Sequence, residues 1–416
     1  MTTIITAHDA QDLLALVPEL AGFRPVESLV LVAFRGKRSC GALRGDLPHS
    51  SDADVLSAVA SSLIGLLCKI PEVDAVVPLV YTSARFDAGN VPPHGEAMNA
   101  LIFHAEESGF LVRDALCVAA DGWASYLDTA VPPGGRSLAL IAESAVNAQL
   151  AAERTPGAPA ERAMHDQRGP DPRGGTADLA TRQRMGRLIN RFRAMANDPA
   201  ALGEPSAELT ALLELPAVAE MSLCCPAETV SELDAAALLF AMQGPPARDM
   251  LLIHWAFGVE AGARAERENL RFAAGEPGAG RESAALFWGE GPRPDPERIE
   301  TAIELLLELV ARAPRRCKPP ALSMLAWLNW ALGRSSRAAV FIEMALAIDP
   351  DYGLAEILET MLSIGRLPEW AFAVPVEAGG SAARHDGRTA ETVTRSSAGR
   401  SARRAGRRAA QRGRGR

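Results

Sequence analysis

Hydrophobic and polar residues alternate in recognisable blocks at the start of the chain. Residues 8–20 carry leucine and valine at helical spacing, and this run ends at Gly22. Residues 28–34 (SLVLVAF) are continuously apolar with β-branched side chains, which predicts a buried strand. Turn chemistry at 35–38 and a second strand over 41–47 would complete a hairpin.

Helices and strands then alternate. The spacing predicts a helix up to residue 69, a strand over 74–81, a helix over 95–108 and a strand over 110–119. Pro78 favours an edge position or a bulge for its strand. Such alternation is typical of parallel βαβ units. We therefore predict an α/β (or α+β) N-terminal domain with a mostly parallel sheet.

The pattern changes after residue 150. Residues 151–177 are rich in proline and glycine, which predicts a flexible linker or loop. Almost everything from 178 to 370 has helical spacing, apart from a second Gly- and Pro-rich loop at 274–296. The predicted organisation is an α/β domain (1–150), a linker (151–177), a helical region (178–370) and a basic tail (371–416).

The last helices of this region include one unit with spacing similar to a tetratricopeptide repeat. Its matching positions are Gly333, Ala338, Ile342, Ala345 and Pro350. Leu322 replaces the usual aromatic residue, and such solenoids need at least about three units, whereas one is visible. We favour a local helical hairpin within a larger bundle.

Several short segments together carry a family resemblance. They are 13–18 (LLALVP), 22–30 (GFRPVESLV), 45–48 (GDLP), 123–126 (WASY), 247–249 (ARD), 320–327 (PALSMLAW) and 345–352 (ALAIDPDY). With them the chain resembles the actinobacterial proteins of the domain of unknown function four-one-nine-two, over most of 10–370. The resemblance implies a coherent fold and no chemistry. Residues 128–133 (DTAVPP) stand where the family often has cysteines, so a metal or bridge is not expected there.

Charge is distributed unevenly along the 416 residues. The formal net charge is −8, but residues 1–370 carry −16 and residues 371–416 carry +8 with 11 arginines. An acidic body repels nucleic acid and anionic membranes, so any such affinity must come from the tail. The tail cannot bury a core, which predicts disorder. It could contact nucleic acid weakly and without sequence preference, dock on the acidic body, or have no role.

Composition and cysteine usage narrow the class of protein. Hydrophobic residues make up 48% and charged residues 23%, which excludes a wholly disordered or fibrous chain. The six cysteines form no CxxC pair, and the first 23 residues have no basic segment of a signal peptide. No apolar run approaches the roughly 18 residues that span a bilayer. We predict a cytoplasmic protein without membrane contact.

Two segments come close to known catalytic motifs. Residues 275–283 (GEPGAGRES) approach a P-loop, but Arg281 replaces its lysine and Glu282 its hydroxyl. His94-Gly95-Glu96 matches part of a zinc deaminase motif without the partner PCxxC, so a polar helix start is the simpler interpretation. We predict no metal and no cofactor.

Topology indicates a candidate site more clearly than motifs do. Ligands of parallel α/β sheets bind beyond the carboxyl ends of the strands, and a hairpin would bring the start of the first strand to the same edge. The candidate ligand-binding residues there are Arg24, Glu27, Asp46, Arg85, Asp121, Trp123 and Tyr126. The alternative is that Arg24–Asp46 or Arg85–Asp121 are ion pairs that close the sheet edge, with Trp123 packed under the linker.

Two functions remain open, and the sequence leaves catalysis undecided. We favour a non-catalytic binding or regulatory protein that holds a protein partner or a small ligand. The alternative is an enzyme acting on a small polar or phosphorylated metabolite at the sheet edge. A deep pocket lined by Asp46, Arg85 and Asp121 would favour the enzyme, and a flat apolar groove along 320–364 would favour partner binding.

Overall fold

The computed structural model describes residues 7–21, 24–86, 91–153, 177–198, 214–278 and 280–372. Most of the predicted linker and nearly all of the predicted tail lie outside these ranges, as do residues 199–213 of the predicted helical region. The described residues contain an α/β part at the N-terminal end, followed by a helical part, as predicted.

The α/β part is built on a six-stranded sheet with the order β2-β1-β3-β5-β6, in which β4 also pairs with β3. The strands are β1 (Ser28–Arg35), β2 (Arg38–Asp46), β3 (Ala75–Tyr81), β4 (Leu111–Val112), β5 (Leu116–Val118) and β6 (Trp123–Ser125). β1 and β2 form the predicted hairpin, and Gly36 adopts φ +54° in its turn. A positive φ in a tight turn is readily adopted by glycine.

The sheet is mixed, and the prediction of a mostly parallel sheet is only partly met. β1 runs antiparallel to both of its neighbours, β2 and β3, and β6 runs antiparallel to β5. β3 is parallel to β4 and β5. The βαβ pattern from β2 to β3 is present in direction, but β1 lies between those two strands. The short hairpin turn causes this, since it folds β2 back along the outer side of β1.

Pro78 lies within the sheet and not in an edge strand. On one side β3 pairs with β1, where Pro78 is opposite Leu31. On the other side β4 pairs with Ala75 and Val76, and β5 pairs with residues 79–81. Pro78 therefore falls in the gap between β4 and β5, where its missing N–H costs no ladder hydrogen bond.

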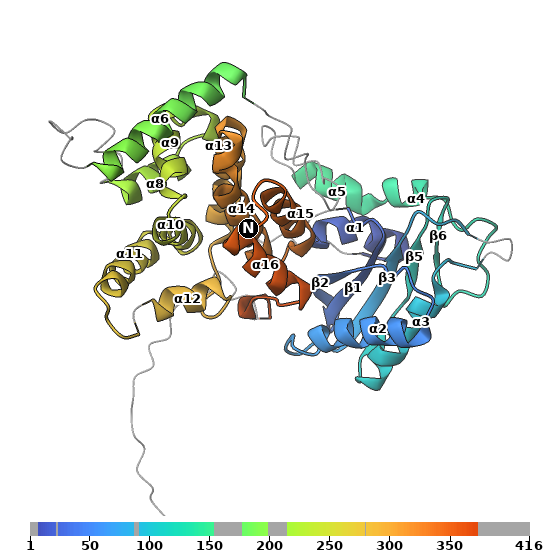
Figure 1. The fold of residues 1–416 in the computed structure, drawn as a ribbon. Coiled ribbons are helices and arrows are strands. Elements are labelled where there is room, and N and C mark those ends of the chain that lie inside the picture. Colours follow the sequence, from blue (N-terminus) through green and yellow to red (C-terminus); the bar gives the residue numbers. More distant parts are fainter. Residues whose placement is uncertain are drawn as a thin grey trace, which may run out of the picture. The chain divides into compact units, whose positions relative to one another are not determined.

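Helices cover both faces of the sheet (Figure 1). α1 (Ala10–Ala21) and α4 (Ala139–Ala142) lie on one face, and α2 (Ala53–Leu67) and α3 (Gly95–Glu107) on the other, with α5 (Ala145–Glu153) following α4. Leu29 and Leu31 join the core on the α2 and α3 face, and Val30 and Val32 join the core on the α1 face. Burial on both faces explains the continuous apolar run of β1.

The helical part packs around a central helix. Its helices are α6 (Leu179–Asn197), α8 (Leu215–Leu223), α9 (Glu232–Ala241), α10 (Pro245–Phe257), α11 (Val259–Ala273), α12 (Arg281–Phe287), α13 (Pro296–Arg312), α14 (Lys318–Ala331), α15 (Ser335–Leu346) and α16 (Gly353–Ser363). Every residue of α14 from Pro319 to Ala331 is buried. α14 and α15 are joined by a short turn at Gly333 with φ +79°, and Ala338 and Ala345 of α15 are fully buried.

The loop predicted over 274–296 contains helix α12, which the flanking glycines and prolines conceal in the sequence. The first amides of α12 are already occupied. The N–H groups of Glu282 and Ser283 donate to the Glu268 carboxylate at 3.4 and 3.0 Å. The interpretation of 275–283 as a loop is therefore only partly correct, since residues 281–283 form the first turn of α12 and two of its amides are bound by a side chain of α11.

No helix among the described residues is both long and apolar enough to cross a membrane.

Candidate functional site

Strand register brings five chain segments to one edge of the sheet. Ser28 is opposite both Asp46 and Tyr81, because β1 lies between β2 and β3. Tyr81 is opposite Val118, and Val118 is opposite Trp123. The starts of β1 and β6 and the ends of β2, β3 and β5 therefore share this edge. We call it the carboxyl rim: residues 24–28, 46–49, 81–86, 93–94 and 118–123.

Glu27 organises the carboxyl rim. Its φ of +43° lies in the left-handed region, a strained conformation for a residue other than glycine. Its carboxylate accepts hydrogen bonds from the Ser83 backbone N–H and from the Thr82 hydroxyl, whose Oγ1 is 3.2 Å from Oε2. Its carbonyl accepts the Leu47 N–H at 3.0 Å. Glu27 thus ties the start of β1 to the ends of β2 and β3.

These hydrogen bonds decide the charge of Glu27. Burial by itself would raise the pKa of this carboxyl group, but the bonds from Ser83 and Thr82 and the nearby His94 bring the pKa below its ordinary value. Glu27 is therefore a carboxylate at neutral pH. A carboxylate can only accept hydrogen bonds, which matters for its neighbours.

His94 reaches the same hydroxyl from the start of α3. It is the residue before the first turn of that helix and has a φ of +62°, the second strained position of the rim. Its Nε2 lies 3.1 Å from Thr82 Oγ1. Partial burial lowers the pKa of His94; Glu27 opposes this shift and His49 adds to it. The imidazole is consequently neutral at pH 7.

A count of donors and acceptors shows the direction of the hydrogen bonds among Glu27, Thr82 and His94. Thr82 Oγ1 accepts the Ala84 N–H at 3.1 Å and has one proton of its own to donate. That proton points to the Glu27 carboxylate, which has none to give. His94 Nε2–H therefore donates to Thr82, and the lone pair of the imidazole lies on Nδ1. Within the described residues Nδ1 of His94 has no hydrogen-bond partner.

Tyr126 supports His94 without lying at the rim. β6 runs away from the rim, and the Tyr126 N–H donates to the Ala115 carbonyl at 2.7 Å. The Tyr126 hydroxyl donates to the carbonyl of Pro93, the residue immediately before His94. Burial raises the pKa of Tyr126, so its hydroxyl keeps the proton that it donates. Tyr126 thereby fixes the backbone that presents His94.

Trp123 lies on the opposite face from Tyr126. It belongs to the core beneath α1 and is 5% exposed, whereas Tyr126 packs against the core beneath α2 and α3. The Arg136 guanidinium lies 5.2 Å from the centre of the Trp123 ring and pairs with Asp128. The sheet therefore separates the two aromatic residues, and they do not form one surface. The sequence pattern did not predict β6, which has three residues and runs antiparallel to β5.

Asp46 and Asp121 are both exposed at the rim and have local partners. Asp46 pairs with Arg44 of the same strand. Asp121 accepts the Phe86 N–H at 3.3 Å, so it holds the loop after β3 against the loop after β5.

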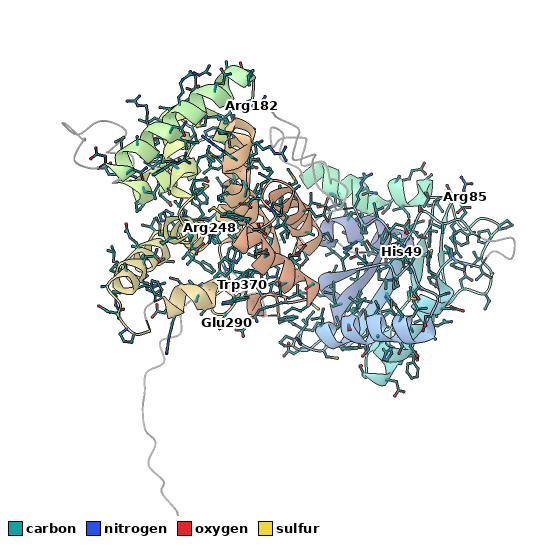
Figure 2. All side chains as sticks on the ribbon, in the orientation of Figure 1. His49, Arg85, Arg182, Arg248, Glu290 and Trp370 are labelled. Carbon is teal, nitrogen blue, oxygen red and sulfur yellow. The ribbon has the colours of Figure 1, made fainter. Side chains whose placement is uncertain are left out.

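Arg24 and Arg85 are exposed, and Figure 2 shows Arg85 at the outer end of the α/β part. Neither guanidinium makes an ion pair within the described ranges. The two ion pairs considered from the sequence, Arg24–Asp46 and Arg85–Asp121, are therefore not formed.

Sequence reasoning missed Thr82 and assigned His94 to a different motif. The sequence does place Thr82 directly after the apolar run of β3, and His94 between a proline and the first glycine of α3. Both are positions where polar side chains reach the end of a sheet. In the part of the chain that the structure describes, no three His, Cys, Asp or Glu side chains are grouped to hold a metal ion.

Comparison with known proteins finds one family. The family model described as Domain of unknown function (DUF4192) matches residues 11–288 and 293–369, which is most of the chain. No curated protein and no solved structure matches. The match includes the whole rim and the helical part up to residue 369, apart from residues 289–292.

Proposed function

The chain belongs to the family of the domain of unknown function DUF4192, and we propose that it binds a small polar ligand at the carboxyl rim. The observation that supports this most directly is the chain of contacts from Glu27 through Thr82 to His94. It holds a neutral imidazole in one orientation with Nδ1 unpartnered within the described residues. Such a nitrogen accepts a hydrogen bond from a hydroxyl or amine of a ligand.

Backbone strain supports a functional role for these residues. Three described residues other than glycine have a positive φ, and two of them are Glu27 and His94. Each such conformation costs on the order of 1–3 kcal/mol, and strain of this kind gathers at ligand sites. Exposed Arg85 and Asp121 flank the same loops and give the rim charges of both signs. A ligand with hydroxyl groups and one charged group best complements the carboxyl rim.

NMR can test this proposal with defined probes. Sugars, hydroxy acids and their phosphates are added one class at a time, and the ring signals of His94 are followed. We expect one class to shift these signals in the intact chain and in Glu96→Gln, which removes an exposed acid in the first turn of α3. Glu27→Gln should abolish the response. The proposal would be contradicted if Glu27→Gln and His94→Gln bind the ligand as strongly as the intact chain does.

Catalysis is the second candidate, and the orientation of His94 favours it. A carboxylate that fixes an imidazole through a hydroxyl leaves the other ring nitrogen able to take a proton from a bound ligand or water. If the ligand is converted, His94→Gln should lower kcat by about 10²–10⁴-fold. An unchanged ligand after prolonged incubation with the intact chain would leave binding as the function.

The basic tail suggests a weak additional contact with nucleic acid, which we include as a separate proposal. Residues 399–416 contain eight arginines and no acid, in a chain that is otherwise acidic. Filter binding of RNA should fall when the chain ends at residue 372, and it should weaken steeply with salt. Equal retention by the shortened chain would dispose of this contact.

A further inference from the structure

A cavity lies in the helical part, far along the sequence from the rim. It has a volume of about 930 Å³ and is bounded by the end of α10, the start of α11, α12, the loop before α13 and the first turn of α13. This volume is within the range of small-molecule sites, about 300–1,000 Å³. Gly258, at φ +90°, makes the sharp turn between α10 and α11 that opens one side.

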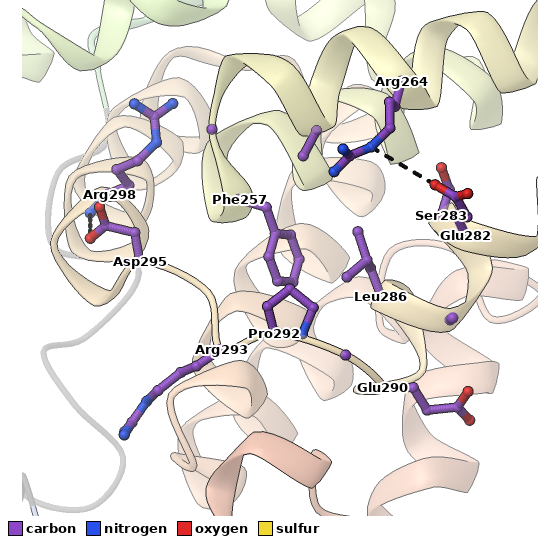
Figure 3. Close-up of a pocket in the computed structure, with 14 residues that line it drawn as sticks. Phe257, Arg264, Glu282, Ser283, Leu286, Glu290, Pro292, Arg293, Asp295 and Arg298 are labelled. Atoms are coloured by element: carbon purple, nitrogen blue, oxygen red, sulfur yellow. Dashed lines mark hydrogen bonds and ion pairs between the residues drawn. The ribbon is translucent and has the colours of Figure 1, made fainter. Parts of the chain in front are cut away.

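The centre of this cavity is apolar and aromatic. Figure 3 shows Phe257, Leu286 and Pro292 gathered in its middle, and Ala261 also lines it. The Phe257 ring is held from the core by edge contacts with Trp327 at 6.4 Å and Trp370 at 5.8 Å between ring centres. A ring held in this way is a rigid platform, which favours a flat apolar ligand over a flexible one.

Most charges around the cavity are already neutralised. Arg264 is 3.9 Å from Glu282 across the opening (Figure 3). Arg298 pairs with Glu220, and Glu290 pairs with Arg366.

Asp295 and Arg293 complete the charged lining. Asp295 caps α13 by accepting the N–H groups of Glu297 and Arg298 at 2.9 and 3.3 Å. Arg293 is exposed and makes no ion pair within the described ranges. Asp295 and Arg293 are thus the two lining charges without an ion pair among the described residues. The Asp295 carboxylate is held by the first amides of α13, whereas the Arg293 guanidinium has no hydrogen bond either and remains available at the edge of the cavity.

We propose that this cavity binds a small molecule with a flat apolar body and one anionic group, which Arg293 meets at the edge. The aromatic platform supplies contact area, and the guanidinium of Arg293, which has no ion pair within the described ranges, supplies charge complementarity. The amides at the start of α12 do not take part, because Glu268 already occupies them. This site is independent of the carboxyl rim, and either can fail without the other.

Two fluorescent probes with the same rings test the proposal. 8-Anilinonaphthalene-1-sulfonate carries one anion, and N-phenyl-1-naphthylamine carries none. Ala285 lines the cavity, and its neighbour Ala284 is exposed and does not line it. Ala285→Trp should fill the cavity and weaken the binding of both probes by about tenfold or more. Ala284→Trp should change the affinity for neither probe by more than about twofold. Circular dichroism of both variants checks that they fold.

The charge is tested separately. Arg293→Glu should weaken the sulfonate probe by about two- to fivefold, since the ion pair is exposed, and leave the neutral probe unchanged. Arg267→Glu, an exposed arginine of α11 outside the lining, is the matched control. The proposal is overturned if the intact chain binds neither probe, or if Ala284→Trp and Ala285→Trp weaken binding equally. If Arg293→Glu lowers the affinity for both probes equally, the ligand's anionic group is not bound by Arg293.

Discussion

Two glutamate–histidine networks lie among the residues that the structure describes, and their surroundings differ. At the rim, Glu27 reaches half-buried His94 through the Thr82 hydroxyl. In the helical part, Glu220 contacts Nε2 of His254 directly at 3.0 Å, and His254 is fully buried. The same residue types thus serve an open edge in one region and a closed core in the other.

The partners of each glutamate show what the difference means. Glu220 also accepts two hydrogen bonds from Arg298, at 2.8 and 2.6 Å, and Arg298 donates to the His254 carbonyl at 3.1 Å. Nδ1 of His254 is buried and has no hydrogen-bond partner among the described residues, so no ligand can reach it. We infer that the Glu220 network braces α8, α10 and α13, whereas the Glu27 network presents an acceptor.

Removing the Glu220 charge should have the largest effect on stability. Glu220→Gln leaves the Arg298 guanidinium without its carboxylate at a site where both side chains are mostly buried. We expect a loss of about 2–3 kcal/mol, below that of a fully buried pair because both side chains keep some exposure. Glu232→Gln breaks an exposed pair with Arg184 and should cost less than about 1 kcal/mol. Urea unfolding measures both, and equal losses would contradict a bracing role.

A methyl group added at Gly262 should cause the next largest loss of stability. A Cβ there would lie 2.5 Å from Nδ1 and 2.6 Å from Cβ of His254, too close to fit without movement. Gly262→Ala should cost about 1–3 kcal/mol from overpacking. Gly65→Ala in α2 has open space and should stabilise the chain by about 0.5–1 kcal/mol. A neutral Gly262→Ala in thermal unfolding would show that His254 is not tightly enclosed.

Acid should weaken both networks, and His254 more than His94. Burial lowers the pKa of each imidazole in the folded state below the unfolded value of 6.5. Their contribution is therefore complete above pH 6.5 and declines as pH falls through the folded pKa, by at most about 1.4 kcal/mol per pH unit per group. His254→Gln should flatten the stability profile between pH 7 and 5 more than His94→Gln does. The reverse order in urea unfolding would refute the assigned burial.

The smallest effect on stability is expected at Thr82. Thr82→Val keeps the shape but removes the hydroxyl between Glu27 and His94, and should cost about 1 kcal/mol. Thr82→Ser keeps the hydroxyl and should cost less. If calorimetry finds the two variants equally stable, the hydroxyl does not connect the two side chains.

The common edge could be predicted because it depends on chain direction alone. A continuous apolar run, a turn and a returning strand place Asp46 beside the start of β1, and Glu27 immediately precedes that start. The crossover through α2 then returns β3 to the same edge. These features are set by periodicity and loop length, which are visible in a sequence.

The inner arrangement of the rim could not be predicted in the same way. The left-handed conformations of Glu27 and His94 are sustained by contacts from Ser83 and Tyr126, which come from distant parts of the chain. The break between β4 and β5 at residues 113–115 coincides with the charged pair Arg113-Asp114, but one such pair within the run over 110–119 does not by itself predict two separate strands. Such details depend on tertiary contacts and not on local preference.

The protonation of His94 tests the central claim most directly. Long-range ¹H–¹⁵N NMR of the intact labelled chain at pH 7, with His94→Gln to assign the signals, reads which ring nitrogen carries the proton. Our account predicts a neutral ring with the proton on Nε2 and a bare Nδ1, and a mixture of tautomers in Thr82→Val. A ring protonated on Nδ1, or on both nitrogens, in the intact chain would contradict it.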